Sequence, residues 1–175
     1  MADQYIEAVI NEALQYRNKG YSVDTLYIGG GTPSLLSTQQ MKRLVLGLRG
    51  VFIFDEGFEF TLEANPGTVT REKAIFYREL GVNRISLGVQ SIHDNELRAL
   101  GRIHSYRDFL HAYRILRDAG FDNINLDIMY AIPEGTEDSL GETLDKEKVR
   151  RRDADPGKYI VAALAALGLD APRVL

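Results

Sequence analysis

The sequence predicts an α/β protein built on a parallel sheet, and two observations carry this prediction. Short strand-type runs of apolar residues alternate along the chain with longer segments whose apolar residues recur at helical spacing. A helix of about ten or more residues between two strands is the connection that a parallel pair requires. Four strands are too few for a closed eight-stranded barrel, so we expect an open sheet or part of a barrel.

The composition is that of a single globular unit, and it excludes several kinds of chemistry. Of the 175 residues, 45% are hydrophobic and 26% charged, with a net charge of −4. This charge gives no footprint for nucleic acid, and no run is long and apolar enough to span a bilayer. The absence of cysteine excludes disulfides, thiolate metal sites and a cysteine nucleophile. The N-terminus lacks a signal-peptide pattern, so we expect a cytoplasmic protein.

The first part of the chain is expected to contain two helices and two strands. A first helix is predicted before Gly20. Its apolar face consists of Ile6, Val9, Ile10, Ala13 and Leu14. Residues 25–28 form an apolar strand that runs into three glycines, and residues 58–62 alternate as a second strand. Between these strands, Ser37 is the expected N-cap of a helix whose apolar face consists of Met41, Leu44, Val45 and Leu48.

The alternation continues after a turn at residues 65–67. Gly81 and Gly120 are expected to end two helices. The predicted order is a helix over 71–80, a strand over 84–89, helices over 94–100 and 106–119, and a strand over 123–129. Ile132 and Pro133 indicate the loop after this fourth strand.

From Asp145 onward the pattern changes. Residues 146–152 contain five basic side chains without interleaved aromatics, which is typical of a solvated surface or a frayed tail. Residues 153–157 are typical of a linker, and residues 162–167 of a short helix. We therefore predict a core over residues 1–144 and a divergent C-terminal tail over residues 145–175.

Glycine and polar residues follow each predicted strand, at the sheet edge where α/β proteins bind ligands. Glycines after the first strand expose backbone N–H groups, and carboxylates accept hydrogen bonds from amines or hydroxyls. Together these donors and acceptors suit a zwitterionic, nucleoside-type ligand. The candidate binding residues are Gly30, Gly31, Thr32, Glu63, Gln90, Arg102 and Asp127.

Each candidate also has a purely structural explanation. The glycines can form a tight turn, Glu63 can stabilise a loop, and Arg102 can lie exposed at a helix end. Asp127 lies among apolar residues, so it needs a hydrogen-bond partner if it is buried. His93, His104 and His111 show no metal-ligand spacing, and we expect structural or surface roles for them. No residue is predicted to be catalytic or to bind a metal.

Five motifs along the chain form a recognisable set. They include Gly-Gly-Gly-Thr-Pro at 29–33, Glu-Ala-Asn-Pro-Gly-Thr at 63–68 and Leu-Gly-Arg-Ile-His at 100–104. The others lie within residues 81–91 and 125–130. In this order the motifs resemble the radical S-adenosylmethionine family of oxygen-independent coproporphyrinogen III oxidases, and within it the haem chaperone branch. The resemblance covers roughly residues 5 to 140.

The resemblance implies a partial (β/α) barrel of the radical S-adenosylmethionine type, with about four βα units here. It also implies that Gly30, Gly31 and Thr32 contact the methionine part of S-adenosylmethionine. Acidic side chains would then reach the amine or ribose, and Arg102 the carboxylate.

Two departures from the family pattern matter. The Cys-x-x-x-Cys-x-x-Cys motif that holds a [4Fe–4S] cluster is missing, so the chain resembles a family member begun late. At the other end the pattern fades after Leu140, and Ala131 and Glu134 replace glycines expected near Pro133.

The family's oxidases generate a 5′-deoxyadenosyl radical, whereas the chaperone branch is associated with passing haem to respiratory proteins. We expect a fragment or split-gene relative in porphyrin or haem metabolism that keeps the S-adenosylmethionine pocket but cannot hold the cluster alone. Whether it is an enzyme stays open. One alternative is a non-catalytic module that binds S-adenosylmethionine or haem. Another is a non-functional truncated product, whose open edges and unburied faces would make isolated folding marginal.

Overall fold

The computed structural model describes residues 1–152, and the side chains of residues 1–147. Its centre is a four-stranded parallel sheet in the order β1-β2-β3-β4. The strands are β1 (Ser22–Ile28), β2 (Ile53–Ala64), β3 (Arg84–Gln90) and β4 (Ile124–Ile128). The prediction of an α/β fold with four parallel strands is therefore confirmed.

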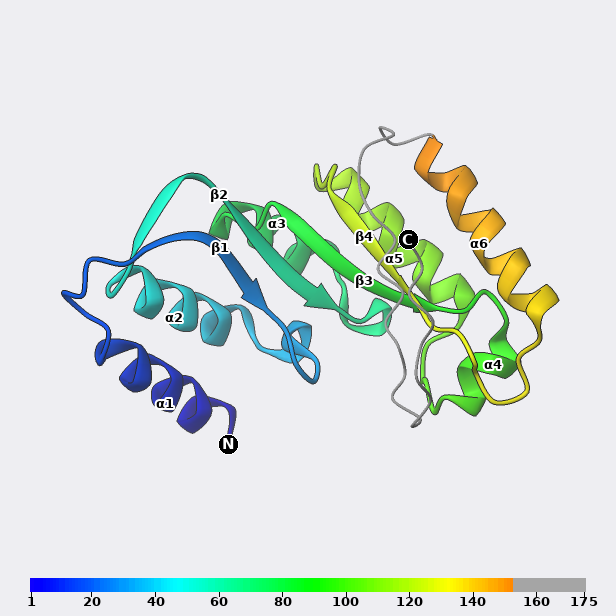
Figure 1. The fold of residues 1–175 in the computed structure, drawn as a ribbon, viewed down its shortest axis with the longest axis horizontal. Coiled ribbons are helices and arrows are strands. Elements are labelled where there is room, and N and C mark those ends of the chain that lie inside the picture. Colours follow the sequence, from blue (N-terminus) through cyan, green and yellow to red (C-terminus); the bar gives the residue numbers. More distant parts are fainter. Residues whose placement is uncertain (153–175) are drawn as a thin grey trace.

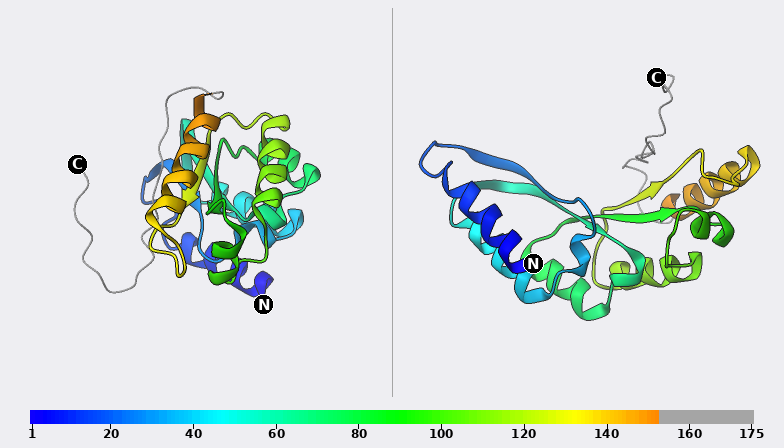
Figure 2. Two further views of the ribbon diagram at one scale, coloured as in Figure 1. Left: turned by 90° about the vertical axis from the view of Figure 1, so that its right-hand side faces the viewer. Right: turned by 90° about the horizontal axis from the view of Figure 1, so that it is seen from below.

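Helices connect successive strands and cover one face of the curved sheet. Four helices lie along this outer face: α1 (Ala2–Leu14), α2 (Thr38–Arg49), α3 (Arg71–Leu80) and α5 (Tyr106–Asp118) (Figures 1 and 2). α4 (Asp94–Ala99) and α6 (Glu137–Arg152) lie together at the β4 end of the molecule (Figure 1). No helix of the described residues covers the inner face (Figure 2).

The two faces of the sheet differ in chemistry because side chains alternate along each strand. The outer face carries the apolar core, including Phe60, Leu62, Ile85, Leu87 and Leu126, all at most 3% exposed. The inner face carries polar residues. Glu63 pairs with Ser86 across β2 and β3, and Ser86 with Asn125 across β3 and β4, so these side chains lie side by side.

Local signals set the bounds of several helices as expected. The Ser37 hydroxyl caps α2 by accepting from the Gln40 N–H, and the Gln40 Oε1 accepts from the Ser37 N–H. Gly81 ends α3 with φ +98°, a conformation that favours glycine.

Three elements differ from expectation, and the first is β1, which begins at Ser22 rather than at residue 25. β2 begins at Ile53 rather than residue 58, and its first part pairs with Ser22 and Val23 of β1 across a register shift. The polar run Asp55-Glu56-Gly57 hides this extension because it lacks strand-type apolar residues.

α6 runs through the proposed boundary at residue 144, and Glu147 within it is only 1% exposed. The division into core and tail stays a prediction. The expected linker at 153–157 and helix at 162–167 lie outside the described residues.

The loop between β4 and α6 holds two residues in the left-handed region, Ala131 at φ +54° and Glu134 at φ +68°. These are the two positions where the resemblance led us to expect glycine. The backbone therefore adopts there a conformation that glycine takes with less strain.

Candidate functional site

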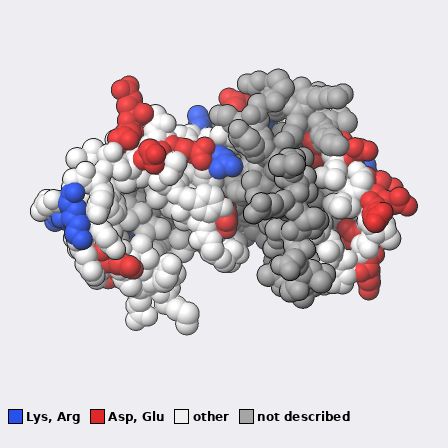
Figure 3. Space-filling view, viewed as in Figure 1, with Lys and Arg blue, Asp and Glu red and all other residues white. Residues whose placement is uncertain are grey.

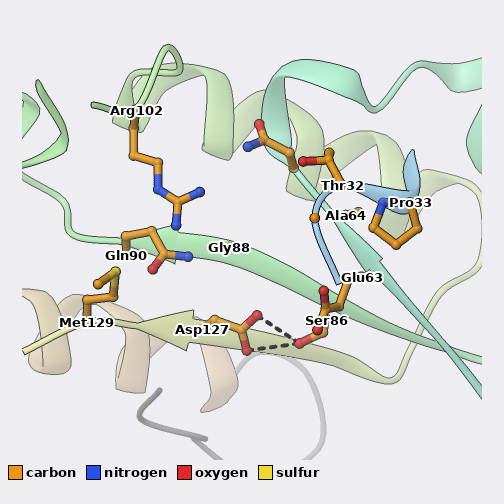
Figure 4. A pocket seen from close by; sticks show the side chains of 12 residues that line it. Thr32, Pro33, Glu63, Ala64, Ser86, Gly88, Gln90, Arg102, Asp127 and Met129 are labelled. Carbon is orange, nitrogen blue, oxygen red and sulfur yellow. Dashed lines mark hydrogen bonds between the residues drawn. The ribbon is translucent and has the colours of Figure 1, made fainter. Parts of the chain in front are cut away.

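A cavity of about 310 Å³ lies at the carboxyl ends of the strands (Figure 4). Six of the seven predicted residues line it: Gly31, Thr32, Glu63, Gln90, Arg102 and Asp127. The seventh, Gly30, adjoins the cavity through its hydrogen bond to Glu63. Ser86 and Met129 also line the cavity and were not predicted.

Glu63 joins β1, β2 and the glycine loop, which consists of residues 29–31. Its Oε1 accepts from the Tyr27 hydroxyl at 2.5 Å, and its Oε2 accepts from the Gly30 N–H at 3.0 Å. A Cβ on Gly29 would come within 2.8 Å of the Glu63 carboxylate, so only glycine fits there. Burial and the bond to Glu63 raise the pKa of Tyr27, which keeps the phenol protonated as the donor.

The glycine loop reaches the cavity through left-handed backbone. Gly30 and Gly31 have φ values of +82° and +65°, and nothing lies within 4 Å of where their Cβ atoms would be. Because these glycines have no side chains, a ligand can come close to their backbone at this edge of the cavity.

Asp127 is held from the inner face of β3 and β4. The Ser86 hydroxyl lies 2.9 Å from both carboxylate oxygens (Figure 4). The Asn125 amide donates to Oδ1 at 2.7 Å. The expectation that Asp127 needs a partner is confirmed. Burial raises the pKa of this carboxyl, Ser86 lowers it, and the negative charge of Glu63 raises it further.

Gln90 closes β3 in an unusual backbone conformation. It has φ +63° at a register shift between Gly88 and Gln90, and it is 7% exposed. Its carbonyl accepts from the Met129 N–H at 2.9 Å. A Cβ on Gly88 would lie 2.6 Å from the Gln90 amide nitrogen, so this glycine makes room for the side chain beside the cavity.

Arg102 comes from the loop after α4, and its guanidinium points toward Gln90 and the cavity (Figure 4). None of the ion pairs in the described part of the chain includes it. The cavity thus presents two carboxylates, one guanidinium, an amide and backbone donors. This set can bind a ligand that carries both an ammonium and a carboxylate group.

The histidines lie apart from this set. His104 is 4% exposed, and burial lowers its pKa, which favours the neutral ring. Within the described residues, no three His, Cys, Asp or Glu side chains are grouped to hold a metal ion. None of the described helices is long and apolar enough to cross a membrane.

Comparison with known proteins identifies the family. Residues 3–146 match the family model of the Radical SAM superfamily. The chain is 40% identical over 144 residues to the haem chaperone HemW of Escherichia coli (strain K12), covering 80% of this chain and 38% of HemW. It is 30% identical over 154 residues to the anaerobic coproporphyrinogen III oxidase 1 of Cereibacter sphaeroides, covering 86% of this chain and 34% of that protein.

The solved structures agree with these sequence relatives. The coproporphyrinogen III oxidase HemN of Escherichia coli, described as a radical SAM enzyme, superposes with a TM-score of 0.75 at 31% identity. That match covers 83% of this chain and 34% of HemN. The chain thus spans less than two fifths of the length of these relatives. It belongs to the radical SAM superfamily, in the group that contains HemW and HemN.

Proposed function

We propose that the cavity binds S-adenosylmethionine. The observation that carries this proposal is the meeting of Glu63, Asp127 and Arg102 in one cavity. The ligand carries an ammonium, a sulfonium and a carboxylate, so its net positive charge complements two carboxylates and one guanidinium. In this arrangement the acids take the amine or a ribose hydroxyl, and Arg102 takes the ligand carboxylate. Gly30, Gly31 and Thr32 contact the methionine part.

The size of the cavity is compatible with this ligand. Its volume of about 310 Å³ is at the lower end for small-molecule sites, which run from about 300 to 1,000 Å³. The glycine edge near Gly31 leaves one side accessible, so part of the ligand can extend along the inner face of the sheet.

The [4Fe–4S] cluster of the family does not fit the residues of this chain. The cluster is held by cysteine thiolates, and the 175 residues contain none. When bound in family members, it supplies the electron for reductive cleavage of S-adenosylmethionine. No such step is assigned to this chain's own residues, whose proposed part is to bind and orient the ligand.

Within the family, we propose a role in haem handling rather than coproporphyrinogen oxidation. The identity of 40% to HemW, against 30% to the oxidase of Cereibacter sphaeroides, favours this choice. In this role haem is the ligand and a respiratory haem protein is its recipient. A non-catalytic haem- or S-adenosylmethionine-binding module is compatible with the same residues, and a cytoplasmic location stays a prediction.

Calorimetric titration with S-adenosylmethionine tests the binding proposal. We expect saturable binding that Arg102→Met weakens at least about tenfold, because the variant loses a charge-assisted bond to the ligand carboxylate. Arg107→Met, which changes an exposed arginine of α5, is the matched control and should bind normally.

Decarboxylated S-adenosylmethionine makes this test specific to Arg102. The native protein should bind it more weakly than the intact ligand, and Arg102→Met should lose this preference for the intact ligand. Absence of heat with the folded native protein would overturn the proposal.

Haem titration tests the family role separately. A shift of the haem Soret band on addition of the protein would support haem handling by this chain. An unchanged spectrum would remove haem as a ligand while leaving S-adenosylmethionine binding to be judged by calorimetry.

A further inference from the structure

A second cavity, of about 340 Å³, lies beside the first, among the loop at residues 130–136, α4 and α6. Met129 lines both cavities, so they share this side chain as part of their walls. The rest of the wall combines apolar side chains, such as Ile132 and Leu140, with hydroxyl groups of Ser139 and Thr143. The proposed binding of S-adenosylmethionine uses none of these four residues.

The wall of this second cavity contains a buried carboxylate, that of Glu96, which is 3% exposed. It accepts hydrogen bonds from two neutral hydroxyl groups, Ser91 at 2.5 Å and Ser139. None of the ion pairs among the described residues includes Glu96. Burying a carboxylate without an opposite charge is unfavourable. A cation bound in the cavity would supply the missing positive charge.

The surroundings of Glu96 add further negative charge. Glu137 lines the cavity, and Asp138 follows it in the first turn of α6. The N-terminus of α6 contributes only about half a positive charge, which two acidic residues in its first turn outweigh. Figure 3 shows acidic side chains gathered at this end of the molecule. The cavity therefore attracts cations and disfavours anions.

The composition of the wall decides which kind of cation fits. The described residues include no group of three His, Cys, Asp or Glu that could hold a metal ion. The apolar side chains instead suit an alkyl group. A Cβ on Gly135 would lie 3.3 Å from Glu96 Oε1, so the glycine keeps the approach to this oxygen free.

We propose that the second cavity binds an aliphatic amine, with its ammonium group at the Glu96 carboxylate. The alkyl chain lies against Met129, Ile132 and Leu140. This inference does not depend on what the first cavity binds.

The methionine methyl groups provide a direct assay. The chain has three methionines, so selective ¹³C-methyl labelling gives three signals in a nuclear magnetic resonance spectrum. Met129 reports on the cavity, whereas Met41 is fully buried in the core and reports on folding. The probe is n-butylamine at neutral pH, where it is protonated, and 1-butanol is its uncharged counterpart. We expect n-butylamine to shift the Met129 signal saturably. It should do so at a concentration at least about tenfold lower than 1-butanol requires.

Variants then locate the binding. Glu96→Gln should weaken n-butylamine binding at least about tenfold, and Asp138→Asn, which changes an exposed acid outside the cavity wall, should weaken it less than threefold. Asp127→Asn separates the two cavities, since it weakens the response only if the amine occupies the first one.

Three results would overturn the proposal: no saturable Met129 shift, equal binding of amine and alcohol, or loss of binding in Asp127→Asn but not in Glu96→Gln. The comparison of amine with alcohol needs only the native chain, so it remains decisive if Glu96→Gln does not keep the native Met41 signal.

Discussion

The hydroxyl of Ser86 lies at the same distance, 2.9 Å, from both carboxylate oxygens of Asp127. Ser86 belongs to β3 and Asp127 to β4, so this contact fixes the orientation of an acid in the first cavity from the neighbouring strand. Because Ser86 itself lines that cavity, the same hydroxyl also lies beside the proposed ligand.

Ser86→Ala should weaken S-adenosylmethionine binding about tenfold, because it removes a hydrogen bond to a charged group that the ligand contacts. The Ser86 bond lowers the pKa of Asp127 against the effect of burial. Its loss should therefore raise that pKa and move the onset of binding to higher pH. Calorimetry at pH 6 and pH 8 checks this, with the exposed Ser22→Ala as control. Equal affinity of Ser86→Ala and the native protein at both pH values would contradict it.

Asp127→Asn should stabilise the protein more at pH 8 than at pH 4, while abolishing ligand binding. Burial raises the pKa of Asp127 in the folded state above its ordinary value of 3.8. Between the pKa of the unfolded chain and the raised pKa of the folded state, the folded state holds the proton more tightly. The free energy of unfolding therefore falls as pH rises through this range. Thermal melts at the two pH values measure the effect, with the exposed Asp55→Asn for comparison. A larger gain at pH 4 would show the opposite sign.

Ala131→Gly and Glu134→Gly should each raise the free energy of unfolding by about 0.5–1 kcal/mol. Both positions have positive φ, where relief of strain outweighs the greater freedom that glycine gives the unfolded chain. The control is Ala119→Gly at the end of α5, where φ is −79° and glycine should destabilise. Chemical denaturation gives all three values. Destabilisation by all three substitutions would mean that the left-handed positions carry no strain.

Incubation with iron, sulfide and a strong reductant should give this chain no capacity to cleave S-adenosylmethionine. The reason is the lack of cysteine among its 175 residues, since thiolates are the ligands that the cluster needs. Chromatography of the reaction for 5′-deoxyadenosine is the measurement. An amount above that of a protein-free control would disprove the expectation.

The sequence was sufficient to predict the sheet and most of the candidate site for a simple geometric reason. Parallel strands all end at one edge, so Glu63, Gln90 and Asp127 had to meet once the strands were recognised. Ser86 was missed although its signal was present. Along β3 it alternates with Ile85 and Leu87, which places it on the polar face beside Asp127.

No helix was assigned to residues 137–152 from the sequence because much of the docking of α6 is polar, although Leu140 and Leu144 also pack against the core. Ser139 donates to the buried Glu96, and the Thr143 hydroxyl accepts from the Ile92 N–H at 3.4 Å. Such contacts leave no apolar stripe in the sequence, so neither periodicity nor composition reveals them. The burial of the Glu96 and Glu147 carboxylates could not be predicted from the sequence for the same reason.

The polar inner face changes the expectation that an open sheet folds only marginally. Thr61, Ser86 and Asn125 on this face are at most 5% exposed, and each donates a hydrogen bond to a neighbouring carboxylate. The face therefore needs no apolar layer to satisfy it. The edge strands β1 and β4 each pair with only one strand among the described residues. Their outer backbone N–H and C=O groups can therefore pair with a strand of another molecule. At high concentration the molecules should therefore associate edge to edge, through added strands, rather than stack face to face.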